Sequence, residues 1–233
     1  MSRINTVGQR WIYKAAKEML IAAGYNANAA KLTTSHIRSE SLMTTGLSNY
    51  PFGILETQGG TNAGGKFPTE VRLRQSDVFV VAMINLQVCK PSSATDQAFR
   101  DVNWGAPLLF TTSGVPAAIE GAYQQGNINM VVDNEQLLYR WPTKLHYKAP
   151  VTQQNSVLYY TGATALGYSD SQDCSEDGWI PCEGNLILSG NSSIETSFNI
   201  GAGMAAIETT GRWILELYGV LAQGCSKTSN QTV

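Results

Sequence analysis

Side chains capable of acid–base or metal chemistry are scarce in this sequence of 233 residues. It contains two histidines, His36 and His146, which excludes a histidine-rich metal site and leaves a Ser-His-Asp triad with two poorly placed candidates. His146 alternates with Lys144 and Lys148, so we expect a solvated basic strip on one face of a strand. His36 lies in a segment without a regular period. The sequence therefore predicts no catalytic residue, no metal ligand and no cofactor, and we do not expect an enzyme.

Carboxylates gather in one segment, SDSQDCSEDGWIPCEG at positions 169–184. Its acidic side chains are Asp170, Asp173, Glu176, Asp177 and Glu183. These oxygen ligands are numerous enough for a calcium ion, but the segment lacks the Asp-x-Asp/Asn-x-Asp/Asn-Gly spacing of a calcium-binding loop. A solvated acidic loop is the favoured interpretation, and calcium binding stays open as the alternative.

Cysteines flank the same loop, because Cys174 and Cys182 stand at a separation that a disulfide can close. Cys89 and Cys225 are isolated in the sequence, and no C-x-x-C pair indicates a zinc site. A bridge between Cys174 and Cys182 and a pair of free thiols are equally compatible with the sequence. The bridge would indicate an oxidising or extracellular setting, such as that of a shell exposed after release.

The composition favours a folded chain with a neutral polar surface. Apolar residues make up 43% of the chain, while charged residues make up only 15% against about 25% in a typical domain. Such a surface tolerates close contact with copies of itself, which fits an assembling protein better than a free enzyme. The net charge is −2, but residues 1–40 contain six basic and two acidic side chains, so the N-terminal segment is the basic part.

An amphipathic helix is predicted from about residue 7 to residue 23, with Gly24 as a C-terminal stop. The larger apolar side chains of this segment recur at helical spacing: Trp11, Ile12, Met19 and Leu20. Lys and Arg interrupt the apolar positions, so we expect neither a signal peptide nor a membrane span. We favour packing of this helix on the β domain. The alternative is an arm that reaches a neighbouring subunit, a membrane or nucleic acid.

The chain is expected to divide into three parts. Residues 1–67 form the helix arm and a linker, because residues 24–67 show no sustained period and close on a Gly-rich tract. Residues 68–224 form a β-sandwich domain, and residues 225–233 form a C-terminal tail. Deleting residues 1–40 is therefore expected to leave the β domain folded.

Short β-type segments follow one another after residue 68, without an intervening helical pattern. They are 69–88, 107–112, 128–132, 136–141, 144–148, 156–161, 185–189, 193–200 and 211–224. This succession predicts an all-β fold, an antiparallel jelly-roll-like sandwich of about eight strands with an N-terminal amphipathic helix arm. The last segment, GRWILELYGVLAQG, has apolar side chains on both faces and is predicted to be buried on both sides.

The segment SDVFVVAMINLQVCK at positions 76–90 also has apolar side chains on both faces in its first half. Strict alternation places the even-numbered residues from Val78 to Val88 on a core face. The opposite face then begins with three large apolar side chains, Phe79, Val81 and Met83, and continues with Asn85 and Gln87. We expect the N-terminal helix or a second copy of the subunit to cover this apolar trio.

A resemblance rests on two stretches, INMVVDNEQLLYRWPTKLHYKAPVTQQNS and LILSGNSSIETSFNIGAGMAAIETTGRWILELYGVLAQG. The pattern of apolar and polar residues in these stretches, with the long apolar strand at the end, resembles that of jelly-roll coat proteins of non-enveloped viruses and bacteriophages. The similarity covers residues 68–222 as a pattern. It implies a shell subunit without catalytic residues, trimeric or pentameric in its capsomer, with the arm facing inward.

The expected function is therefore that of a structural virion protein, a self-assembling capsid subunit located in the virion. Its expected partners are copies of itself and other virion proteins, with no small-molecule substrate; packaged nucleic acid or an internal membrane near the basic arm stays open. The rival interpretation is a carbohydrate-binding or adhesin-type β-sandwich, in which exposed aromatic side chains line a shallow groove. The candidates for that groove are Trp104, Trp141, Tyr159, Tyr160 and Trp179.

Overall fold

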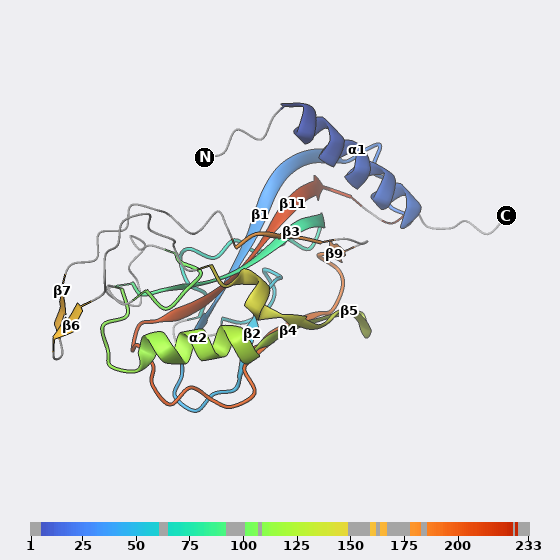
Figure 1. Ribbon diagram of the computed structural model, residues 1–233. Coiled ribbons are helices and arrows are strands. Elements are labelled where there is room, and N and C mark those ends of the chain that lie inside the picture. The colour runs from blue at the N-terminus through green and yellow to red at the C-terminus, as the bar shows by residue number, and fades with distance from the viewer. Residues whose placement is uncertain are drawn as a thin grey trace.

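Two antiparallel sheets packed face to face form the body of the protein in the computed structural model (Figure 1). The structure describes residues 6–60, 65–91, 101–106, 109–148, 159–161, 164–166, 178–182, 186–225 and 227. Within these, residues 6–11, 159–161 and 164–166 are described by their backbone alone. The predicted β-sandwich is therefore confirmed as two packed antiparallel sheets.

The larger sheet has five strands, in the order β1-β11-β3-β8, with β9 also paired to β3. Its strands are β1 (Lys31–Leu42), β3 (Val78–Cys89), β8 (Ile180–Pro181), β9 (Ile187–Ser189) and β11 (Arg212–Gln223). The second sheet has four strands in the order β2-β10-β4-β5. They are β2 (Asn49–Phe52), β4 (Asn127–Val132), β5 (Glu135–Pro142) and β10 (Ile194–Asn199). A separate pair joins β6 (Tyr159–Thr161) to β7 (Thr164–Leu166).

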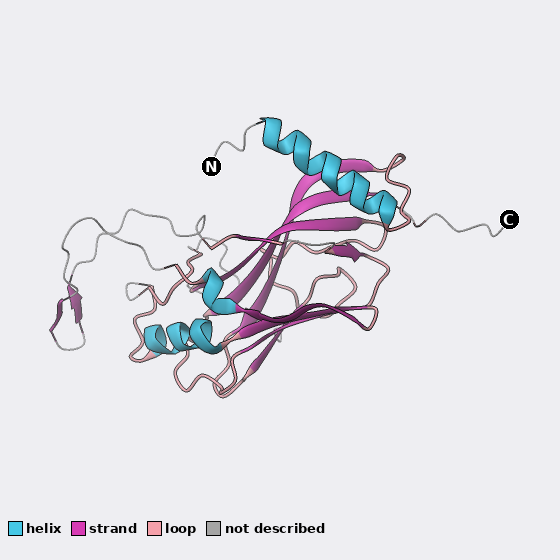
Figure 2. Ribbon diagram, turned by 45° about the vertical axis from the view of Figure 1, so that its right-hand side comes forward, coloured by secondary structure: helices cyan, strands magenta, loops and turns pink. Residues whose placement is uncertain are grey.

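The helices lie outside the two sheets. Figure 2 shows α1 (Thr6–Ala22) across one end of the five-stranded sheet, while α2 (Val115–Gln125) lies beside the four-stranded sheet. A short 3₁₀ helix, η1 (Thr143–His146), follows β5 and contacts α2. The amphipathic helix predicted over residues 7–23 is thus confirmed. Neither described α-helix combines the length and the apolar character that crossing a membrane requires.

Aromatic rings fill the core between the sheets. Trp213 of β11 is fully buried and meets Phe198 of β10 edge-on, with ring centroids 4.8 Å apart. Tyr50 of β2 and Tyr123 of α2 contact the same indole at 6.2 and 5.6 Å. One tryptophan therefore joins both sheets and α2, and edge-on contacts of this kind stabilise a core beyond the area that they bury.

The strand β3 contains a β-bulge in its pairing with β11. Met83 pairs with Tyr218 and Val81 pairs with Gly219, so Ala82 is an extra residue without a partner on β11. Because side chains alternate with a period of two, one inserted residue reverses the faces of everything beyond it.

This reversal corrects the predicted faces of β3. Phe79 and Val81 share the inner face, and the core between the sheets, with Ile84 and Leu86. Val78, predicted to share that face, lies on the outer face instead, in a separate cluster beneath α1. Strict alternation was the wrong assumption, because the bulge changes the phase of the strand at its middle.

The predicted linker over residues 24–67 is also wrong. It contains β1 and β2, and β1 pairs with β11 along its whole length, from Lys31–Gln223 to Leu42–Arg212. The segment KLTTSHIRSESL carries few apolar side chains, so its sequence lacks the hydrophobic signal of a strand. Residues 1–40 therefore include most of a strand of the main sheet, and their deletion would remove it.

The prediction of β structure without helices after residue 68 fails in three places. α2 occupies VPAAIEGAYQQ, where Val115, Ile119, Ala122 and Tyr123 are buried at helical spacing. The segment 144–148, predicted as a strand, begins within η1. In the predicted segment 107–112, the described residues 109–112 are turn and loop. The spacing of the buried positions in α2 and Pro116 in its first turn were available signals.

The β-bulge predicts a contrast between two glycines. A Cβ added at Gly219 would lie 2.0 Å from the Val80 carbonyl oxygen, whereas one added at Gly121 on α2 meets nothing within 4 Å. We expect Gly219→Ala to lower the free energy of unfolding by about 1–3 kcal/mol, because the bulge must distort. Gly121→Ala, the matched control, should leave it unchanged or raise it by about 0.5–1 kcal/mol. Urea denaturation measures both, and equal effects would contradict the assigned bulge.

Candidate functional site

The outer face of the five-stranded sheet, turned away from the four-stranded sheet, is the candidate site because the buried charges of Arg38, Glu40 and Arg212 lie together on it. Its two ends differ in character. At one end Val78, Val80 and Val220 form an apolar cluster that Ala16 and Leu20 of α1 cover. At the other end β1 and β11 carry arginine and glutamate side chains instead.

Arg38 of β1 is the centre of the charged end. Its Nη1 donates to Asp101 Oδ2 at 2.6 Å and to Glu216 Oε1 of β11 at 3.0 Å. Its Nε donates to Glu40 Oε1 at 2.7 Å. One guanidinium thus holds three carboxylates that come from two strands and a loop.

Arg212 of β11 completes this group from the other side of Glu40. Its Nη1 donates to Glu40 Oε2 at 2.8 Å, and both side chains are fully buried. The guanidinium carbon lies 3.9 Å from the ring centroid of Phe67, a cation–π geometry. Thr69 donates its hydroxyl to Glu40 Oε1. The loop segment that contains Phe67 and Thr69 is therefore bound to the sheet by charge.

A second buried pair lies beside the first. Arg72 Nη2 donates to Glu70 Oε1 at 2.9 Å, and Arg72 Nη1 donates to the carbonyl oxygens of Gln58 and Gly59 at 3.0 Å. Glu70 also accepts hydrogen bonds from the backbone N–H of Glu40 and of Phe67 at 3.0 and 2.8 Å. We call these four carboxylates and three arginines the ion cluster: Glu40, Glu70, Asp101, Glu216, Arg38, Arg72 and Arg212.

The electrostatics of the ion cluster oppose acid–base chemistry. Burial disfavours the charge of Arg38, but the hydrogen bond to Asp101 and the surrounding carboxylates outweigh it and raise the pKa of Arg38. Burial raises the pKa of Glu216, and the charge of Arg38 partly offsets this effect. Each charge is met by an opposite one within hydrogen-bond distance, as buried charges require. The arrangement fastens strands and loops together.

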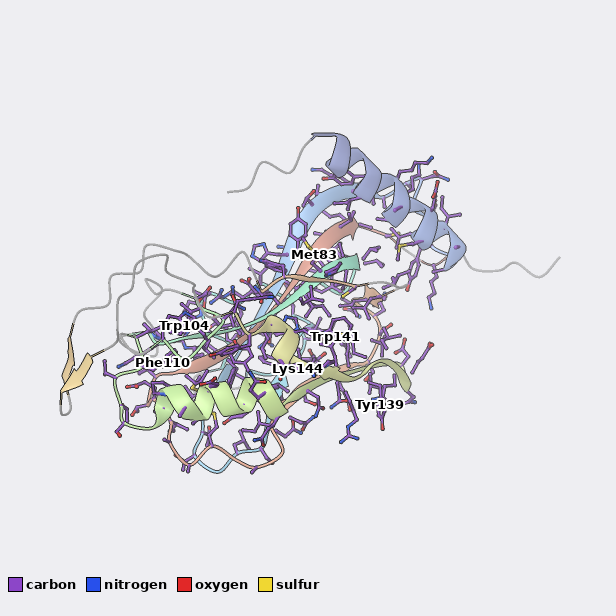
Figure 3. All side chains as sticks on the ribbon, in the orientation of Figure 1. Met83, Trp104, Phe110, Tyr139, Trp141 and Lys144 are labelled. Atoms are coloured by element: carbon purple, nitrogen blue, oxygen red, sulfur yellow. The ribbon has the colours of Figure 1, made fainter. Side chains whose placement is uncertain are left out.

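His146 lies in a second polar cluster, between η1 and the segment after residue 177. Its Nδ1 donates to the carbonyl oxygen of Gly178 at 2.9 Å, and its Nε2 accepts from Trp141 Nε1 at 3.0 Å. Burial lowers the pKa of His146 to about 4, an effect that the bond to Gly178 partly opposes. The imidazole is therefore neutral near pH 7 with both nitrogens engaged. The predicted solvated strip with Lys144 is wrong, because η1 turns His146 inward; Figure 3 shows Trp141 and Lys144 around this turn.

Amide side chains line the neighbouring part of the outer face. Asn103 Nδ2 donates to Asn85 Oδ1 and to the Leu86 carbonyl oxygen, both at 2.8 Å. A Cβ at Gly178 would lie 2.1 Å from Asn103 and 2.5 Å from Asn85, so this glycine permits the close approach of the loop. A polar loop therefore covers the outer face of β3 at this end of the strand.

The predicted interface residues divide between the two faces. Leu20 is fully buried against the chain's own sheet, and Ile12 and Met19 are partly buried in the same cluster, so the favoured packing of the helix on the β domain is confirmed. The side chain of Trp11 lies outside the described residues.

The apolar trio of β3 is not a single patch. Phe79 and Val81 lie in the core between the two sheets, so the prediction that α1 or a second subunit covers them is wrong. Met83 lies on the opposite face, where it is half-buried. The β-bulge at Ala82 is the reason for this separation.

The remaining predicted sites lie at the margin of the described structure. Cys182 is a free cysteine, and burial raises the pKa of its thiol to about 12. Cys174 lies outside the described residues, as do the carboxylates predicted as an acidic loop over 170–183. Within the described part of the chain, no group of three His, Cys, Asp or Glu side chains is arranged to hold a metal ion.

The aromatic side chains of the rival carbohydrate-binding interpretation do not form an exposed row where they are described. Trp104 and Trp141 pack against the core and are half-buried. Trp179 meets Tyr218 edge-on, with ring centroids 6.2 Å apart. Side chains of Tyr159 and Tyr160 are outside the description.

Sequence reasoning missed the ion cluster. Its members are scattered between positions 38 and 216, and Arg38 and Glu40 fall in the segment predicted as a linker. The available signal was Arg38 and Glu40 alternating on one side of a short polar stretch, since like-facing opposite charges are typical of a strand with a buried polar face.

Comparison with known protein families, curated proteins and solved structures finds no match for this chain. Its function must therefore be argued from the geometry of its own residues.

The ion cluster predicts a large cost when one partner is removed. We expect Arg212→Met to lower the free energy of unfolding by about 3–5 kcal/mol, because it leaves Glu40 buried with less compensation. Arg74→Met is the matched control: Arg74 pairs with Glu56 at 3.5 Å in an exposed position, and its loss should cost less than about 1 kcal/mol. Chemical denaturation compares the two, and similar losses would contradict the structural role of the cluster.

His146 predicts a pH dependence of stability. Its pKa in the folded chain is about 4, against about 6.5 in an unfolded chain, so between these values the unfolded state binds more protons. Stability from the neutral imidazole is complete above pH 6.5 and falls by up to about 3 kcal/mol as the pH drops to 4. His146→Gln should remove this component, while His36→Gln, at an exposed position on β1, should retain it. Thermal melting measured from pH 7 to pH 4 compares the two variants. Identical profiles of stability against pH would refute the role assigned to His146.

Proposed function

We propose that this chain is a structural subunit that assembles with copies of itself into the shell of a virion, as a capsid protein. The proposal includes a jelly-roll-like connection of the two sheets. It assigns the buried charges to the stability of the subunit and the outer surface to contacts with neighbours.

The observation that carries the proposal is the separation of two exposed apolar side chains. Ile21 on α1 is 48% exposed, and Tyr139 on β5 is 71% exposed. α1 lies on the five-stranded sheet and β5 belongs to the other sheet (Figures 1 and 3). A subunit that uses unlike contact points at separate places forms heterologous contacts, which join many copies either into closed rings or into open assemblies. Tyrosine is also enriched at the energetically important centres of interfaces.

The composition supports the same conclusion. Only 15% of the residues are charged, and several of these side chains pair with one another inside the ion cluster. A low share of charged residues weakens the repulsion between copies, and depletion of charge is typical of interface centres.

A separate and narrower proposal concerns what the helix α1 contacts. Arg38 and Glu40 belong to the ion cluster, so the basic character of the N-terminal segment rests on residues such as Lys14 and Lys17. Lys14 is exposed and lies 3.9 Å from Glu18, one helical turn away. We propose contact of this helix with packaged nucleic acid, an internal membrane or other virion proteins only as an addition to self-assembly.

Assembly can be tested at Tyr139. We expect the purified chain to form large closed particles, and Tyr139→Ser to raise the concentration needed for assembly at least tenfold, because an exposed aromatic contact is lost. Gln136→Ser, at an exposed position of the same strand, should assemble as the parent does. Light scattering after size exclusion and electron microscopy measure the result. A parent chain that stays monomeric at high concentration would contradict the proposal and favour a carbohydrate-binding module.

A further inference from the structure

The strand β1 has one open edge. Its other side pairs with β11 over twelve residues without a register shift. On the open side, the described residues pair with it at one place, where Arg38 and Val71 exchange backbone hydrogen bonds of 2.8 and 2.9 Å. Backbone groups of alternate residues point to the same side of a strand. Those of Leu32, Thr34 and His36 therefore point outward along the same edge as those of Arg38.

Tyr13 of α1 covers the middle of this edge. Its hydroxyl oxygen accepts the backbone N–H of Thr34 at 2.8 Å, and it lies 2.6 Å from the Thr34 hydroxyl. The helix thus occupies an outward donor that would otherwise pair with another strand.

The other sheet edges of the described structure are protected in ways that β1 is not. In β5 two register shifts interrupt the pairing, and Arg140 has a φ of 49°. β2 has four residues and contains Pro51, while β8 and β9 have two and three. Bulges, proline and short length are the usual protections of an edge. The strand β1 is regular and twelve residues long. Its edge is covered by the helix α1 instead.

We propose that the open edge of β1 pairs antiparallel with β1 of a second copy of this chain, and that Tyr13 keeps the edge closed until α1 moves aside. This inference rests on the proposed function, because it names one contact of the assembling subunit.

The length of the edge favours a second copy as the occupant. Antiparallel pairing centred on Thr34 places Leu32 of one copy opposite His36 of the other, which satisfies every outward backbone group up to Arg38. β1 begins at Lys31, so the partner strand starts opposite Ile37, just before Val71 takes over the edge. Val71, which is 41% exposed, would then lie against the partner chain.

Charge adds to this fit. In that register the partner's Lys31 shares a face with Ile37, which lines a groove of about 350 Å³. The charged side chains along the groove are Glu56, Glu70, Asp77, Arg72 and Arg74. One carboxylate is in excess over the guanidinium groups, so an incoming ammonium meets a complementary surface.

Three variants test the inference. Tyr13→Phe keeps the ring in the apolar cluster but releases the Thr34 N–H, and we expect it to lower the dissociation constant of the dimer about fivefold, the effect of one hydrogen bond. His36→Pro removes an outward N–H without touching the pairing with β11, and should raise that constant at least tenfold. His36→Ala, the matched control, keeps the N–H and should behave as the parent. Analytical ultracentrifugation measures all four chains.

Hydrogen exchange in the unsubstituted chain provides a readout that does not depend on the folding of any variant. We expect the amides of Leu32 and His36 to exchange at least tenfold more slowly in the assembled form than in dilute monomer. Unchanged exchange at these amides in assembled protein would overturn the β1 contact and leave the proposed function standing. Parent and Tyr13→Phe chains that both stay monomeric at every concentration would overturn the two together.

Discussion

The burial of the strand β11 on both of its faces is the constraint on which the rest of the structure depends. Its inner face places Trp213 among aromatic rings of both sheets and α2. Its outer face carries Arg212 and Glu216 at one end and Val220 at the other. A buried charge is tolerated only with an opposite charge and hydrogen bonds. The charged end therefore requires Arg38, Glu40 and the loops bound to them, while the apolar end requires α1.

This constraint explains why the arginines and carboxylates of the ion cluster face inward, where they hold the strands and loops together. The arginines and carboxylates of the ion cluster tie β1, β11 and two loops to one another. His146 ties η1 to the segment around Gly178. Apolar side chains such as those of Ile21 and Tyr139 are exposed at separate places on the surface.

Sequence reasoning succeeded where the signal was local and regular. The two apolar faces of β11, the strands β4, β5 and β10 and the helix α1 follow from periods of two or 3.6 residues that each segment carries by itself. It failed for β1, because KLTTSHIRSESL has no apolar period, and for α2, because its helical spacing was not weighed against the surrounding β pattern. The site was the least predictable part, since Arg38 and Glu216 become neighbours only through strand pairing.

The sequence by itself determined a mainly β fold with an amphipathic N-terminal helix, because burial of apolar side chains selects the period of each segment. Only the tertiary structure decided which residues of β3 face the core, because the bulge at Ala82 arises from pairing with β11 and has no mark in the local pattern. Tertiary structure also decided that Arg38 is part of the interior and not of a basic arm. The physical reason is the same in both cases: hydrophobic periodicity is a property of neighbours in the chain, whereas register and charge pairing are properties of residues that only folding brings together.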